Sequence, residues 1–171
     1  MNFYKNLVVV FAGILALIIV FSCQKPKTFS NTPEITYKDF VKLQYTVGTN
    51  TGKDSAGILK FNFTDGDGDI GLNPGDTSDI YSGVYYNDFF AIQYEMKNEA
   101  WVADTYKFNE RIPFLTPQGS SNALQGEIDI SWSLNNPLKQ IDTVKWEFWI
   151  CDRALNLSNH QFTPQIIVKS F

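Results

Sequence analysis

Three aspartates alternate with glycines in the segment 63–71, whose sequence is FTDGDGDIG. Asp65, Asp67 and Asp69 lie directly after an apolar run, and carboxylates this close repel one another unless a cation or hydrogen-bond donors compensate. Hard oxygen ligands on a backbone that glycine makes flexible are what Ca²⁺ selects. We therefore predict a structural Ca²⁺ site here. The alternative is a solvated turn without metal, because Asp and Gly are also the usual residues of turns.

The spacing partly matches the calcium loop of EF-hands. Asp65, Asp67 and Asp69 take the first, third and fifth places of that loop, and Asp76 takes the twelfth. Ile70 stands where the loop requires glycine, and the expected flanks are strands, so this is not an EF-hand. Asp76 is kept as a further candidate ligand.

A second chemical signal is the cysteine that follows the apolar start of the chain. Lys5 precedes an apolar run from Leu7 to Phe21, which ends at Ser22-Cys23. This order is typical of a secretion signal, and it resembles the lipobox of bacterial lipoproteins, which implies cleavage before Cys23 and lipidation of that cysteine. An uncleaved transmembrane helix is the alternative, but the run is shorter than the roughly 20 residues that a bilayer core needs. We expect a signal peptide over 1–22, and a lipidated cysteine with a flexible tether over 23–34.

Composition narrows the possible partners. The chain has 14 basic and 18 acidic residues, and loss of Lys5 with the signal leaves 13 against 18, a net charge of −5. This sign argues against nucleic acid or an anionic membrane surface as the partner, because both select clustered Lys and Arg. If Cys23 carries lipid, Cys151 has no partner for an intramolecular disulfide, and its apolar surroundings predict a buried, inert thiol.

Alternation of apolar and polar residues predicts about seven strands and no helix in the domain. Val144 to Cys151 is one example, with Trp146, Phe148 and Ile150 expected on the core face. The seven expected strands lie near residues 41–47, 58–63, 84–96, 101–108, 124–132, 144–151 and 165–169. Such a pattern, joined by turn residues, predicts an all-β fold, an antiparallel β-sandwich over residues 35–171.

The strand order also predicts which loops meet. If successive strands run antiparallel, the loops after the second, fourth and sixth strands lie at one end of the sandwich. These loops are residues 64–83, 109–123 and 152–163. Asp152 and Asn156 would then approach the acidic loop, and we include both as further candidate ligands.

A resemblance supports the same fold. The segment 152–159 looks like the last connection of bacterial immunoglobulin-like and fibronectin-like domains, although Leu155 replaces the usual glycine. Together with Cys23 and the DGDGDIG loop, it resembles uncharacterised lipoproteins of Bacteroidetes-type bacteria. The resemblance implies an exported immunoglobulin-like domain, lipid-anchored to the cell envelope at the outer membrane, and it implies no activity.

Three classes of function are compatible with these features. An enzyme is the least favoured, because the chain has one histidine, His160, and no nucleophile and base at a recognisable spacing. We predict no catalytic residue. A binding or interaction domain for a protein or glycan is favoured, on the aromatic residues between 81 and 101. These aromatics are alternatively core residues. A structural subunit of an envelope complex is the alternative function, and a carbohydrate-active enzyme is a less favoured alternative.

Overall fold

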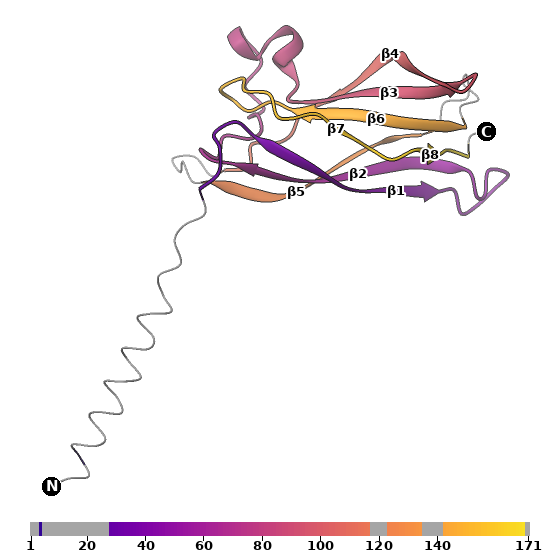
Figure 1. The fold of residues 1–171 in the computed structure, drawn as a ribbon, viewed down its shortest axis with the longest axis horizontal. Coiled ribbons are helices and arrows are strands. Elements are labelled where there is room, and N and C mark those ends of the chain that lie inside the picture. Colours follow the sequence, from indigo (N-terminus) through magenta and orange to yellow (C-terminus); the bar gives the residue numbers. More distant parts are fainter. Residues whose placement is uncertain (1–3, 5–27, 117–122, 135–141, 170–171) are drawn as a thin grey trace.

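The computed structural model describes residue 4 and residues 28–116, 123–134 and 142–169, and strands dominate this part of the chain (Figure 1). Two short 3₁₀ segments, η1 and η2, interrupt the connection between the second and third strands. The elements are β1 (Glu34–Gln44), β2 (Asp54–Asp65), η1 (Asp79–Tyr81), η2 (Gly83–Tyr86), β3 (Phe89–Lys97), β4 (Ala100–Glu110), β5 (Leu124–Ser133), β6 (Thr143–Ile150), β7 (Gln161–Phe162) and β8 (Ile166–Ile167).

The strands form two sheets that pack face to face. One sheet has the order β1-β2-β5, and the other has the order β4-β3-β6-β7, with β8 also paired to β6. All of these pairs are antiparallel. This arrangement is an immunoglobulin-like β-sandwich, so the predicted fold class is confirmed.

The described chain has eight strands where about seven were predicted, because the last edge strand is divided. β7 pairs with Glu147 and Phe148 of β6, whereas β8 pairs with Thr143 and Val144. Pro164 lies between β7 and β8, and proline has no N–H to donate to a ladder. The sequence pattern revealed only the second half of this edge.

The core lies between the sheets, and β6 shows how its residues reach it. Trp146, Phe148 and Ile150 are at most 2% exposed, as predicted, whereas Glu147 and Trp149 between them are only partly buried. Phe148 packs against the ring of Phe61 from the opposite sheet, with centroids 5.4 Å apart. Burial of side chains of this size contributes about 1.5–3 kcal/mol each, so the alternating pattern accounts for much of the fold's stability.

The prediction for the first strand was wrong in its limits and its facing. β1 begins at Glu34 and ends at Gln44, and its pairing with β2 shifts between Tyr37 and Asp39. This irregularity turns Phe40 toward the core, where its ring stacks 4.9 Å from Trp146. Leu43 and Val47, two of the alternating apolar residues from which a half-buried strand was predicted at 41–47, are 45% and 80% exposed. An irregular register reverses the facing of later residues, which simple alternation does not reveal.

The third strand also starts later than predicted. Residues 84–86 belong to η2, and β3 begins at Phe89. The hairpin to β4 is as expected, with Lys97 paired to Ala100 across a two-residue turn. Asn98 and Glu99 in this turn both have positive φ, as a type I′ turn requires.

Residues that precede the predicted domain boundary at residue 35 already contact the sandwich. The Ser30 carbonyl accepts a hydrogen bond of 2.7 Å from the Gly66 amide in the acidic loop, and Pro33 is buried. A side chain at Gly66 would lie 2.5 Å from the Phe29 carbonyl, so glycine is required for this approach. The segment 28–33, predicted as tether, thus packs on the sandwich. Cys23 and the expected signal peptide, apart from Tyr4, lie outside the described residues.

Candidate metal site

The loops that follow β2, β4 and β6 meet at one end of the sandwich, as the strand order predicted. We call this the loop end; it lies at the left in Figure 1. Isolated β-bridges join Ile70 to Asp152 and Leu72 to Pro113, so all three loops are in contact. Gly71 lies between the bridges with φ of 92°, and a Cβ there would lie 2.2 Å from the Pro113 carbonyl oxygen. Only glycine permits this packing.

Three aspartates from two of these loops form a cluster that could hold a metal ion. Asp65 is the last residue of β2, Asp69 follows in the same loop, and Asp152 follows β6. One carboxylate oxygen from each lies within 4.8 Å of the other two. Asp65 and Asp152 are buried and Asp69 is partly buried. Predicted ligands from distant parts of the sequence are therefore brought together.

Several oxygens at this site have no donor. Oδ1 of Asp65, of Asp67 and of Asp69 is buried without a hydrogen-bond partner. The other oxygen of Asp65 accepts a bond of 2.9 Å from the Asp69 amide. A buried polar atom without a partner is costly, and it is rare in folded proteins. A cation would satisfy the oxygens of Asp65 and Asp69, whereas Asp67 is not in the group of three carboxylates that lie close enough to share one ion.

The electrostatics of the cluster agree with this geometry. Burial raises the pKa of Asp65 to about 6, and the charges of Asp67 and Asp152 act in the same direction. Burial also raises the pKa of Asp69 to about 6, with Asp152 and Asp67 as the next contributors. The pKa of Asp152 is raised as well, chiefly by burial. Without a cation, burial and mutual repulsion favour the protonated form of these carboxyl groups. A bound divalent ion would instead lower their pKa values.

Asp76 and Asn156, the other predicted ligands, have different partners. The Asp76 carboxylate forms an ion pair with the Arg153 guanidinium and accepts a bond of 2.8 Å from the Asn73 amide. Asn156 supports Asp152, because its backbone and side-chain N–H groups donate to the two carboxylate oxygens at 2.7 and 2.8 Å. Asp76 is thus neutralised within the chain, and Asn156 orients a neighbouring ligand.

Two supporting residues were missed by sequence reasoning. The Thr116 hydroxyl donates to the Gly68 carbonyl at 2.5 Å, and the Arg153 amide donates to the Asp69 carbonyl at 3.3 Å. Both contacts hold the acidic loop against its neighbours. No local pattern marks either residue, because each contact joins segments far apart in sequence.

The cysteine and the histidine of the described chain lie in settings that do not favour chemistry. Burial raises the pKa of Cys151 to about 12, and the charge of Asp152 adds to this, so the thiol stays protonated and is a poor nucleophile. The His160 ring stacks on Trp149, with centroids 4.4 Å apart, and its Nδ1 lies 2.7 Å from Glu147. Both contacts place His160 on the outer face of the second sheet.

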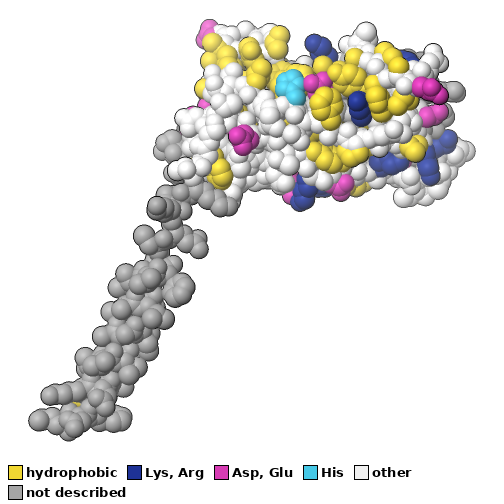
Figure 2. Space-filling view, in the orientation of Figure 1, with side chains coloured by type: hydrophobic (Ala, Val, Ile, Leu, Met, Phe, Trp, Pro, Cys, Tyr) yellow, Lys and Arg dark blue, Asp and Glu magenta, His cyan; other side chains and the backbone are white. Residues whose placement is uncertain are grey.

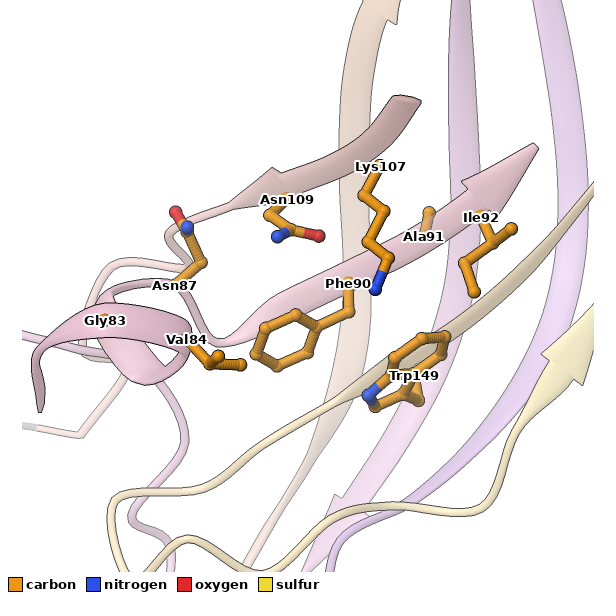
Figure 3. A pocket seen from close by; sticks show the side chains of 9 residues that line it. All are labelled: Gly83, Val84, Asn87, Phe90, Ala91, Ile92, Lys107, Asn109 and Trp149. Atoms are coloured by element: carbon orange, nitrogen blue, oxygen red, sulfur yellow. The ribbon is translucent and has the colours of Figure 1, made fainter. Parts of the chain in front are cut away.

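The aromatic residues considered as a binding surface divide between core and exterior. Phe89 is fully buried, and Phe90 is 5% exposed and stacks on Trp149, with centroids 5.6 Å apart. Figure 3 shows a small cavity beside this pair, with Val84 at one side and Lys107 at another. Its volume of about 190 Å³ is below the roughly 300 Å³ at which typical ligand pockets begin. The cavity is therefore smaller than a typical small-molecule pocket.

Fold and site together define an immunoglobulin-like β-sandwich with an acidic cluster that could hold a metal ion. Comparisons with protein-family models, with curated proteins and with solved structures found no match. Among the described residues, no helix has the length and apolar composition needed to cross a bilayer.

Proposed function

We propose that this protein is a lipid-anchored interaction domain of the bacterial cell envelope whose sandwich is stabilised by Ca²⁺. The lipid is carried on Cys23 and holds the exported domain at the outer membrane. The observation that carries the calcium assignment is the group of three buried carboxylate oxygens without partners, on Asp65, Asp67 and Asp69. A binding role, for a protein or a glycan, is preferred to catalysis because Cys151 and His160 lie in settings unsuited to it.

The donor set favours Ca²⁺ over other common ions. All the candidate ligands are carboxylates, supplied by Asp65, Asp67, Asp69 and Asp152, and hard oxygen ligands suit Ca²⁺ and Mg²⁺. Zinc prefers nitrogen and sulfur, and the nearest sulfur, on Cys151, stays protonated. Mg²⁺ demands a near-ideal octahedron and usually keeps several waters, whereas Ca²⁺ accepts the irregular set that a glycine-rich loop offers.

The role of the ion would be structural. Bound Ca²⁺ would neutralise repelling carboxylates that join the loop after β2 to the loop after β6. Holding these two loops together fixes the whole loop end, since the loop after β4 contacts the first of them. Such an ion adds stability because it binds the folded state and not the unfolded chain.

Thermal unfolding of the chain from Gln24 to Phe171 tests the proposal. At a hundredfold excess of Ca²⁺ over Kd, stability should rise by about 2.7 kcal/mol, which corresponds to about 5–10 °C in Tm. Millimolar Ca²⁺ should be tested against chelator, because extracellular modules bind at the weak end of the affinity range. Mg²⁺ at the same concentration should give a smaller shift.

Two variants locate the ion. Asp67→Asn combined with Asp69→Asn should abolish the Ca²⁺ shift, because two of the three carboxylates whose oxygens lack donors become neutral amides. Asp79→Asn is the matched control: Asp79 is exposed in the same loop and has a φ of 54°, a conformation that Asn tolerates. It removes a nearby charge and should leave the shift intact. No shift in the unmodified chain would leave the loop as an acidic turn.

A further inference from the structure

Large apolar side chains are exposed at the loop end. Val84 is 70% exposed and Ile80 is 54% exposed, both in the η1–η2 segment. Tyr86, Leu115 and Leu157 are each 40–45% exposed, and the last two belong to the loops after β4 and β6. In Figure 2 hydrophobic side chains gather over the η1–η2 segment, at the upper left of the domain. Apolar groups from all three loops are thus exposed at the loop end.

The η1–η2 segment is held against the sandwich by an arginine from the loop after β6. The Arg153 guanidinium lies 5.2 Å from the Tyr81 ring centroid and 5.0 Å from that of Phe114, and it pairs with Asp76. The Tyr81 hydroxyl donates to the Arg153 carbonyl at 3.1 Å. Asp152, which precedes Arg153, belongs to the candidate metal site. The loop after β6 therefore contacts the η1–η2 segment and also contributes to that site.

A second arginine holds the other side of the segment. The Arg111 guanidinium lies 4.7 Å from the Tyr86 ring centroid and donates to the carbonyls of Asn73 and Asp76 at 2.9 and 3.1 Å. The exposed side chains of Ile80 and Val84 are therefore presented by a segment with fixed contacts at both ends.

The length of chain between the proposed lipid and the domain limits how the sandwich can sit. Ser30 is bound to Gly66 at the loop end, and it follows Cys23 by seven residues. Seven residues span at most about 25 Å. The sandwich is longer, because the 12 residues of β2 extend for about 40 Å. A tether this short cannot run the length of the domain, so the loop end cannot point away from the membrane.

We propose that the loop end docks on the bilayer, with Ile80, Val84 and Tyr86 entering its interface. The inference rests on the proposed lipidation of Cys23 and adds a second contact between domain and membrane. Tyrosine with aliphatic neighbours suits the boundary between headgroups and acyl chains. Ca²⁺ at the acidic cluster would lower the negative charge that opposes phosphate headgroups. The opposite end of the sandwich then remains accessible to other partners.

Depth-dependent quenching tests the orientation in the full-length lipidated protein. The protein is reconstituted into vesicles of phosphatidylethanolamine and phosphatidylcholine that contain a spin-labelled lipid, in millimolar Ca²⁺. An environment-sensitive fluorophore is placed on Val84→Cys or, as control, on Val47→Cys. Val47 is 80% exposed in the β1–β2 turn at the opposite end. The buried Cys151 thiol, with its pKa raised to about 12, should not label in the folded protein.

We expect the probe at position 84 to be quenched several-fold more than the probe at position 47, with a blue-shifted emission. A second test places the probe on Leu157→Cys and adds Ile80→Asp. If the loops enter the interface together, the added charge should reduce quenching at position 157.

The following results would overturn the inference. Equal, weak quenching at positions 84 and 47 would mean that the domain stands away from the bilayer. A blue shift at position 84 that requires an added protein, without quenching by lipid, would mean that the exposed apolar residues of the η1–η2 segment bind a protein. Mass spectrometry of the same preparation separates the remaining cases. Unmodified Cys23 would remove both the anchor and the docking, whereas lipidated Cys23 with an unquenched probe at 84 would remove the docking alone.

Discussion

Strand β2 carries a fully buried aspartate at each end, and the two have opposite surroundings. Asp54 and Asp65 are both 0% exposed. The Asp54 carboxylate accepts hydrogen bonds from the Lys42 ammonium at 2.9 Å, the Gln44 amide at 3.0 Å and the Lys169 backbone N–H at 2.7 Å. Burial acts to raise its pKa, but these donors outweigh burial and the pKa is lowered.

Asp65, at the other end, has other carboxylates as neighbours instead of a cation. One of its oxygens has no partner, and burial raises its pKa to about 6. The same residue type at the same degree of burial is therefore stabilised as an anion at one end and destabilised at the other. The contrast teaches that burial alone does not define a metal site. A site is indicated where the chain buries anions and supplies no counter-charge.

The largest loss of stability should follow from a substitution at Asp54, whose carboxylate has hydrogen-bond partners within the chain. Asp54→Ala removes the anion that Lys42 and the Lys169 N–H bind. Removing one partner of a buried pair costs about 3–5 kcal/mol, and because the Lys42 side chain is 28% exposed we expect about 2–4 kcal/mol. Urea denaturation should show this loss equally with and without Ca²⁺. A loss of stability that appears only in chelator would mean that the two ends of β2 are coupled, which contradicts the contrast between Asp54 and Asp65.

A substitution at Asp65, at the other end of β2, should instead increase stability when it is measured in chelator. Asp65→Asn removes one repelling charge and keeps an oxygen for the Asp69 amide, so the Ca²⁺-free protein should gain about 1–2 kcal/mol. The same variant should lose most of its stabilisation by Ca²⁺. Urea denaturation in both conditions measures the two effects, and destabilisation in chelator would mean that Asp65 is already compensated within the chain.

The pH dependence of stability should also distinguish the two ends. The pKa values of Asp65 and Asp69 are raised to about 6, so the folded state keeps protons that the unfolded state releases above about pH 4. Stability in chelator should therefore fall as pH rises from about 4 to 6. Asp54, with its lowered pKa, contributes stability that is lost only as pH falls below about 4.

Calcium should change the part of this pH dependence that comes from Asp65 and Asp69, and it should leave the part from Asp54 unchanged. Metal binding requires ionised carboxylates, so excess Ca²⁺ should remove most of the fall between pH 4 and 6. Asp88 provides an internal reference: burial raises its pKa to about 7, and it lies outside the cluster. The contribution of Asp88 to stability should continue to decline up to about pH 7 in either condition, and Asp88→Asn should remove it. Melting curves from pH 4 to 8 decide this, and identical profiles with and without Ca²⁺ would exclude the site.

Much of the fold could be predicted because strand alternation is local. Trp146, Phe148 and Ile150 lie two residues apart, so a single strand places them on one face whatever the neighbouring strands do. The errors arose where the backbone departs from regular pleating. The irregular register after Tyr37 reversed the facing of Leu43, and Pro164 divided the last edge strand.

Two features of the site could be predicted from residue order alone: three carboxylates repel one another in one loop, and strand parity brings the loop after β6 to the same end. Both follow from short-range chemistry and from the alternating direction of antiparallel strands. Which acidic residues lack counter-charges depends instead on contacts between distant segments in the folded chain. Asp76 meets Arg153 and Asp54 meets Lys42, whereas Asp65 and Asp69 meet Asp152. The physical reason is that the energy of a buried charge depends on the few ångströms around it, and chain segments far apart in sequence supply those surroundings.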